Sequence, residues 1–357
     1  MTIPHPIEDE HMPLSEQQEL ACAWFARLRG EICERFEAIE AEMGSNAAFT
    51  RTTWEKSPED ELQGSGTVAL MNGAVFEKVG VNISTVYGEF SEKFRHEIPG
   101  GSADPRFWAS GISLVAHPRS PRVPAAHFNT RMIVVGGDIP QGRPGGRPSP
   151  EPISFGEQQA SQGDSANRIW FGGGGDLNPM LEEDTDRADF HAAFEAACDE
   201  YDPAFYPAFS RWCDEYFYIP HRGRTRGVGG IFYDYLGLHR LGEDTSPVDP
   251  SQFGKGGVGK EHTRAGMQLA ADCGLDWHEA FAFTRRVGEA FRDIYPELVR
   301  RHMREEYTPE ERDIQLIKRG HYAEYNLLYD RGTRFGLMTG GNPEAILMSL
   351  PPEARWP

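Results

Sequence analysis

The chain has 357 residues, 39% of them hydrophobic, which is enough for one large domain or two ordinary ones with a sizeable core. Its formal net charge is −19 at pH 7. This charge argues against nucleic acid or an anionic membrane as a partner, because both require a basic surface. An anionic substrate would therefore need a local arginine-rich pocket.

The cysteines predict a reducing compartment. The chain has five, an odd number, and no C-x-x-C pair, so a disulfide framework or a thiolate zinc site is not expected. The first residues are acidic and polar and lack the basic and apolar regions of a signal peptide. No stretch approaches the length of a transmembrane helix. We expect a cytoplasmic protein without stable membrane insertion.

The first half of the chain reads as one helix followed by strands. Ser15 and Gln18 form a capping-box pattern, and apolar residues then recur at helical spacing up to Gly44. From residue 48 to about 136, short β-rich segments separated by glycine predict consecutive antiparallel strands. Residues 138–168 are rich in Pro, Gly, Ser and Gln, which predicts a flexible surface loop.

The second half mixes helices and strands. In chain order we expect a strand at 168–173, helices at roughly 185–201 and 204–218, a strand at 226–236, a loop at 240–262, a helix from 276 to about 304, a helix opened by a capping box at 308–311, and strand-like segments at 321–330 and 345–351. There is no internal repeat. This order favours a single α+β domain built on a large antiparallel sheet.

Two glycine-rich stretches resemble nucleotide-binding motifs without matching them. Residues 254–260 nearly match a P-loop, but Glu261 stands where Ser or Thr is needed, and no buried strand precedes the motif. The run at 172–175 lacks the spacing of a dinucleotide-binding turn. Nucleotide binding is not expected.

The strand at 127–131 carries the most informative pattern. His127, Asn129 and Arg131 point to one face, while Phe128 and Thr130 point to the other. A sheet face that only packs against a core should be apolar. A row of an imidazole, an amide and a guanidinium therefore indicates a binding site for an anion.

The preceding strand could extend this row. Ser113 and His117 share one face of residues 111–117, and prolines at every third position then bring the chain back. The alternative is an edge hairpin whose polar residues are solvated. The number of hydrogen-bonding side chains at alternate positions favours the site.

Asp176 and Arg226 are further candidates. Asp176 follows the glycine run, where a ligand can approach the backbone closely; its carboxylate could bind a ring N–H, or form a simple Asx turn. Arg222, Arg224 and Arg226 form the densest basic cluster. A solvated loop explains the first two, whereas Arg226 leads directly into a strand and is suited to a carboxylate.

Four histidines could in principle converge on a metal ion: His117, His127, His191 and His221. They are scattered, and no two have the i, i+4 spacing of a helical pair. Structural or acid–base roles are the preferred interpretation.

Several long motifs occur together in one order: WASGISLVAHPRSPRVPAAHFNTR, WFGGGGDLNPM, FYIPHRGRTRGVGGIFYDYL and YNLLYDRGTRFGLMTGGNPEAILMSLPP. With them, from about residue 18 to the C-terminus, the chain resembles the oxygen-dependent coproporphyrinogen III oxidases. The resemblance implies oxidative decarboxylation of two propionates of coproporphyrinogen III to vinyl groups in haem biosynthesis. Molecular oxygen is the oxidant, and no organic cofactor is expected.

The resemblance also implies an architecture. We expect an α+β domain over residues 15–357, after a tail at 1–14, with an antiparallel sheet of about seven strands flanked by helices on both faces. It further implies a homodimer, with residues 322–357 in the dimerisation region.

Site roles follow from matching positions. The resemblance implies that His127 donates a proton and that Asp176 binds pyrrole N–H groups. It implies substrate contacts by Ser113, Asn129, Thr130, Arg131, Arg226, Gly340, Gly341 and Asn342. The four histidines match positions assigned to a divalent cation, a requirement that is disputed within the family.

The sequence departs from the family pattern at a few positions. Thr130 replaces a common Tyr, Asn342 replaces a common Arg, and Thr225 replaces a second arginine found in some members. A charged substrate contact at position 342 is therefore in doubt. Two alternatives remain open: a non-catalytic porphyrin-binding protein on the same fold, and a histidine-ligated metalloenzyme with another substrate.

Overall fold

A seven-stranded antiparallel sheet forms the centre of the molecule, in the order β1-β2-β3-β4-β5-β6-β9. The computed structural model describes residues 12–92, 95–136, 168–182, 184–240, 261–338 and 342–357. The strands are β1 Thr50–Glu55, β2 Gln63–Met71, β3 Phe76–Glu89, β4 Arg106–Pro118, β5 Ala125–Val135, β6 Arg168–Asn178 and β9 Gly229–Arg240. The expected fold class is confirmed.

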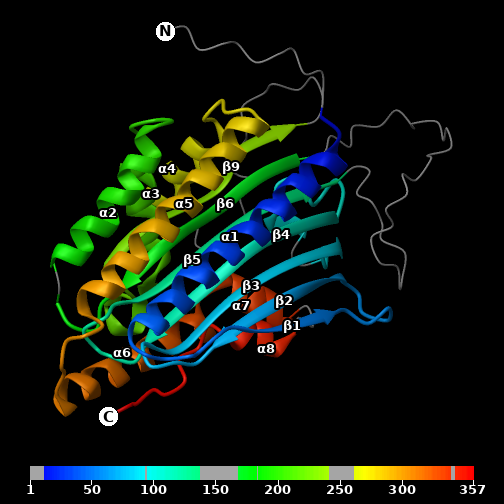
Figure 1. The fold of residues 1–357 in the computed structure, drawn as a ribbon. Helices are drawn as coiled ribbons and strands as arrows, with labels where there is room; N and C mark the ends of the chain where they lie inside the picture. Colours follow the sequence, from blue (N-terminus) through cyan, green and yellow to red (C-terminus); the bar gives the residue numbers. More distant parts are fainter. Residues whose placement is uncertain (1–11, 93–94, 137–167, 183, 241–260, 339–341) are drawn as a thin grey trace, which may run out of the picture.

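Helices lie on both sides of the sheet. They are α1 Leu14–Glu42, α2 Asp184–Asp199, α3 Phe205–Tyr216, α4 Glu261–Ala271, α5 Trp277–His302, α6 Pro309–Leu328, α7 Arg331–Met338 and α8 Pro343–Leu347. In Figure 1, α1 and α5 cross one face, and α7 and α8 lie behind the strands on the other. A small hairpin, β7 Tyr218–Ile219 and β8 Arg224–Thr225, encloses the turn η2 Pro220–Arg222.

The face covered by α1 and α5 holds the main core. Phe128 on β5 stacks on Phe291 of α5 at 4.7 Å between ring centroids. Phe171 on β6 stacks on Phe281 at 5.7 Å. Because side chains alternate along a strand, the residues directly before and after Phe128 and Phe171 face the other side of the sheet.

Helix starts match the sequence patterns in part. The capping box at Thr308 forms with Glu311, and a second box forms between Asp276 and Glu279. The box predicted at Ser15 is wrong. The helix starts one residue earlier, after Pro13, whose extended backbone forms the N-cap without a side-chain hydrogen bond.

The two C-terminal strand predictions are also wrong. Residues 321–328 belong to α6, and residues 345–347 belong to α8. The buried residues Tyr322, Tyr325 and Asn326 recur at intervals of three and four, which is the period of a helix face. Their aromatic and branched neighbours favoured strand by propensity alone, but the capping box at Thr308 starts a helix that continues through them.

The glycine run is not a turn. Residues 172–175 and Asp176 lie inside β6, between β5 and β9. Glycine is required there because neighbouring backbone is close: a Cβ on Gly174 would lie 2.1 Å from the carbonyl oxygen of Ile231. The Asx-turn alternative for Asp176 is therefore excluded.

Some predicted segments fall outside the described residues, namely the loop at 138–167, the P-loop-like stretch at 254–260, and Gly340 and Gly341. Within the described chain, no helix has both the length and the hydropathy needed to cross a membrane.

Candidate active site

Strand register gathers the predicted polar residues on the sheet face opposite α1 and α5. Ser113 on β4 lies opposite Asn129 on β5, and His127 lies opposite Asp176 on β6. Residues directly opposite in an antiparallel sheet share one face. The shared face of His127, Asn129 and Arg131 is confirmed. The edge-hairpin alternative is wrong, because β4 and β5 lie in the middle of the sheet.

Asp176, near the end of β6, forms a buried ion pair with Arg226 on this face. Arg226 donates from Nε and Nη2 to Asp176 Oδ2 at 3.0 and 2.9 Å, and from Nη1 to Asn326 Oδ1 at 2.8 Å. Its guanidinium lies 3.9 Å from the ring centroid of Phe217 and 4.6 Å from that of Tyr322. The sequence predicted that Asp176 binds a ring N–H of the ligand and that Arg226 binds a ligand carboxylate. In the structure the two side chains are bonded to each other.

Burial dominates the electrostatics of the pair. It raises the pKa of the Asp176 carboxyl above its ordinary value, although the contacts with Arg226 and Asn178 oppose the shift. Burial would lower the pKa of Arg226, but Tyr322 and Asp176 outweigh it and raise that pKa. Arg226 therefore carries a permanent positive charge inside an acidic protein.

A second arginine pair lies further along the same face. Arg131 Nη2 donates to Asp234 Oδ2 on β9 at 2.7 Å, and Trp170 Nε1 donates to Asp234 Oδ1 at 3.1 Å. Arg331 of α7 lies half-buried beside this pair; Tyr235 and the neighbouring Asp234 raise its pKa, against the effect of burial. Sequence reasoning missed Asp234 and Arg331. In the sequence, Arg331 stood out only as one residue of the C-terminal motif YNLLYDRGTRFGLMTGGNPEAILMSLPP, which carries the family resemblance.

His127 is held neutral in this arrangement. Burial lowers its pKa well below the ordinary value, and the positive charges of Arg226 and Arg131 lower it further. Its Nδ1 is buried without a hydrogen-bond partner in the described chain. A neutral imidazole is a poor acid, so proton donation requires a change in the charge around the ring.

Several buried polar atoms on this face lack any partner among the described residues. They are Asn82 Oδ1, His127 Nδ1, Asn129 Oδ1, Asp176 Oδ1 and Asn178 Oδ1. Buried polar atoms in folded proteins are nearly always hydrogen-bonded, because leaving one unpaired costs free energy. A group of unpaired atoms on the face that also carries two arginines indicates a ligand site.

Two residues that were predicted to contact the substrate do not offer their side chains to this face. Thr130 is fully buried on the opposite face, where it pairs with Ile112 and Gly173. Asn342 accepts hydrogen bonds from the backbone N–H groups of Glu344 and Ala345 as the N-cap of α8, so its side-chain oxygen is already engaged.

The four histidines do not converge. His117 Nε2 donates to the Ser349 carbonyl at 2.9 Å, and burial together with Arg319 lowers the pKa of His117 to about 3. His191 contacts Tyr206 Oη and the Val228 carbonyl, and His221 contacts Tyr329 and Glu324. Across the described ranges, no group of three or more His, Cys, Asp or Glu side chains could hold a metal ion. The residues do not fit a shared metal site, and no metal-dependent step is derived.

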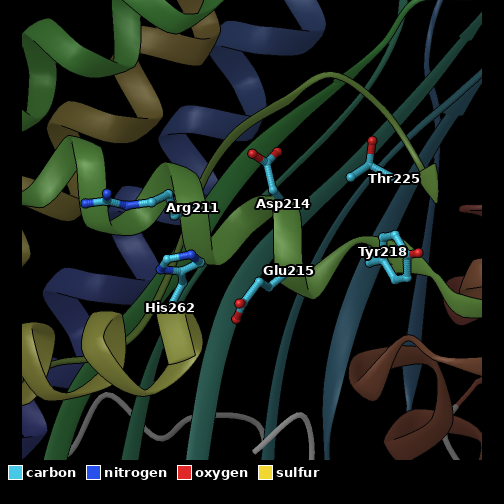
Figure 2. Close-up of a pocket in the computed structure, with 6 residues that line it drawn as sticks. All are labelled: Arg211, Asp214, Glu215, Tyr218, Thr225 and His262. Carbon is cyan, nitrogen blue, oxygen red and sulfur yellow. The ribbon is translucent and has the colours of Figure 1, made fainter. Parts of the chain in front are cut away.

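An open depression of about 500 Å³ lies between the end of α3, the β7–β8 hairpin and the start of α4. Figure 2 shows the consecutive residues Asp214 and Glu215 pointing in opposite directions. Glu215 caps α4 by accepting from Thr263 N and Oγ1. None of the predicted site residues lines this depression, and its side chains do not converge on a ligand.

Nearly the whole chain is similar to proteins of one family. Residues 21–357 match the family model described as coproporphyrinogen III oxidase. The chain is 44% identical over 346 residues to the oxygen-dependent coproporphyrinogen-III oxidase of Rickettsia bellii (strain OSU 85-389), covering 96% of this chain and 99% of that protein. The proteins of that name from Rickettsia africae (strain ESF-5) and Rickettsia akari (strain Hartford) show the same identity and coverage.

Proposed function

The chain belongs to the coproporphyrinogen III oxidase family, and from that premise we propose how its polar sheet face carries out the reaction. The activity is the oxygen-dependent oxidation of coproporphyrinogen III in haem biosynthesis. For each propionate that reacts, R–CH₂CH₂–COO⁻ + O₂ + H⁺ gives R–CH=CH₂ + CO₂ + H₂O₂. The side chain loses two electrons to oxygen, and one net proton is consumed.

The observation that carries the site assignment is the group of unpaired buried polar atoms beside the two arginines. We infer that substrate propionates bind Arg131 and Arg226, since planar guanidinium groups pair well with carboxylates. A propionate at Arg226 would weaken its contact with Asp176. The carboxylate of Asp176 is then available to a pyrrole N–H, where it raises the electron density of the ring.

His127 supplies the proton in this proposal. Burial, together with the charges of Arg226 and Arg131, lowers the pKa of the imidazole and keeps it neutral in the free protein. Bound propionates offset those charges, so the pKa of His127 rises when substrate enters. The histidine becomes an acid only with substrate present, which matches the net consumption of one proton. Position and electrostatics are the protein's contribution.

An assay in air and under anaerobic conditions tests the function. We expect coproporphyrinogen to be consumed only with oxygen, with one H₂O₂ formed per propionate lost, before and after treatment with a chelator. Absence of turnover in air would support the non-catalytic porphyrin-binding alternative. Activity lost on chelation and restored by a divalent cation would support the metalloenzyme alternative.

We also propose a homodimer through the C-terminal region. Leu327, Leu328 and Trp356 are large apolar side chains with 47%, 54% and 54% of their surface exposed. Such a cluster within residues 322–357 is typical of a protein–protein interface. Light scattering with size exclusion should give a dimer for the native chain and a monomer for Leu328→Arg. A native monomer would contradict the proposal.

A further inference from the structure

Asn82 on β3 extends the polar row by one strand beyond the residues already assigned. The register places Asn82 opposite Ser113, which lies opposite Asn129. The three side chains therefore share the face that carries the site. Two strand spacings, about 10 Å, separate Asn82 from Asn129, so the two amides reach different parts of a large ligand.

The amide of Asn82 has no structural partner. Its Oδ1 is buried without a hydrogen bond in the described chain, while the residue as a whole is only half-buried. Its neighbours at alternate positions on the same face of β3 are Gly80 and Ser84, both small. Rotation of the amide about the Cβ–Cγ bond exchanges the positions of Oδ1 and Nδ2, so the same place can hold a donor. An unpaired, partly desolvated amide costs stability, unless a ligand completes its hydrogen bonds.

Asn82 also lies at the side of the site that lacks an arginine. Arg131 is held by Asp234 of β9, and Arg226 by Asp176 of β6. Val68, opposite Asn82 on β2, packs on Met348, which follows α8, so this helix closes the row at β2. The N-cap of α8, Asn342, uses its side chain on its own helix. Lys78 lies on the same face of β3, but its Nζ donates to the Leu350 carbonyl at 2.8 Å. The amide of Asn82 is the neutral donor that this strand offers to a carboxylate.

We propose that Asn82 Nδ2 donates a hydrogen bond to a substrate carboxylate at the β3 side of the site. The inference rests on the proposed function, since the carboxylate is a propionate of the tetrapyrrole. Asn82 contributes to substrate affinity and not to the folded state. Replacing Asn82 should therefore change substrate affinity, whereas replacing a residue that packs in the core would lower the stability of the folded chain.

Steady-state kinetics of Asn82→Ala and Asn82→Asp test the proposal. Losing a hydrogen bond to a charged group should raise KM about tenfold in Asn82→Ala, with kcat little changed. Asn82→Asp should raise KM further, because a second negative charge faces the propionate. Asn72→Ala is the matched control: Asn72 is exposed in the β2–β3 turn and donates to the Glu77 carbonyl, so its loss should leave KM unchanged.

Thermal unfolding of Asn82→Leu provides the second readout. Replacing an unpaired amide by an apolar group of similar size should leave the Tm unchanged or raise it. A KM for Asn82→Ala within about twofold of the native value, or an Asn82→Asp variant that binds as tightly as the native chain, would overturn the proposal. Failure of the native chain to consume coproporphyrinogen in air would instead overturn the proposed function.

Discussion

At the scale of single residues, each arginine of the site is bonded to its own carboxylate. The sequence pointed to Arg131, Asp176 and Arg226, because their residue types and flanking patterns are unusual in an acidic chain. It could not predict their partners. Asp176 lies 50 positions from Arg226, and Arg131 lies 103 positions from Asp234. The order of the strands brings Arg131 on β5 close to Asp234 on β9, and the connection between β8 and β9 brings Arg226 to Asp176.

Asp176→Asn tests the role of the central carboxylate. The amide keeps the shape and an acceptor oxygen toward Arg226 but cannot offer a negative charge to a pyrrole N–H. We expect kcat to fall about 100-fold or more, with a much smaller change in KM. Peroxide release in a steady-state assay measures both. An unchanged kcat in a folded variant would refute the role.

Gly172→Ala tests the second pair. A Cβ on Gly172 would lie 2.6 Å from Asp234 Oδ1 and 3.0 Å from Arg131 Nη2. The methyl group should displace Arg131 and raise KM about tenfold or more, as expected when a hydrogen bond to a charged group is lost. Gly30→Ala is the control: it lies in α1 with no atom within 4 Å of a Cβ. Its activity should not change, and the helix should gain up to about 1 kcal/mol of stability.

At the scale of elements, the sequence predicted the strands of the sheet better than the C-terminal helices. The β-rich segments between 48 and 136 alternate and are separated by glycine, so their structure is local. Residues 321–328 form a helix because Thr308, well upstream, starts it and because its buried face packs on the sheet. Tyr322 and Tyr325 contact Arg226 there, so an error in this element also concealed one wall of the site.

Attachment of α6 to the sheet depends on Glu77. This β3 residue accepts from Arg312 at 2.9 Å and from Arg319 at 2.8 Å, and Arg319 is fully buried. Glu77→Gln leaves that guanidinium with an uncompensated charge, so unfolding in urea should require about 3 kcal/mol less. Asp313→Asn is the control on the same helix, since its pair with Arg355 is exposed and should contribute less than about 1 kcal/mol.

The pH dependence of this attachment has a definite sign. Burial would raise the pKa of Glu77, but Arg312 and Arg319 outweigh it and lower that pKa in the folded chain. The stabilisation is complete above the unfolded pKa, about 4.3, and is lost as pH falls through the lower folded value. Urea unfolding from pH 7 downward should show this loss in the native chain and not in Glu77→Gln. Equal acid sensitivity of the two proteins would contradict the assignment.

At the scale of the whole molecule, the sheet divides a packed core from a reactive face. Alternation along β5 places Phe128 on the face covered by α5 and His127, Asn129 and Arg131 on the opposite face. The sequence predicted this division and the fold class from local patterns. The family resemblance implied a cation site at the four histidines, whereas their spacing in the sequence favoured separate roles. The structure places them on separate elements, each with its own partners.

A structure of the protein with a bound, unreactive tetrapyrrole that carries propionates tests the central claim most directly. We predict that the ligand lies on the face formed by β3 to β6 and α6, with carboxylates bonded to Arg131 and Arg226 and with Asp176 turned to a pyrrole nitrogen. A ligand bound in the depression beside α3 and α4 (Figure 2), or one that leaves the Asp176–Arg226 pair unchanged, would contradict it.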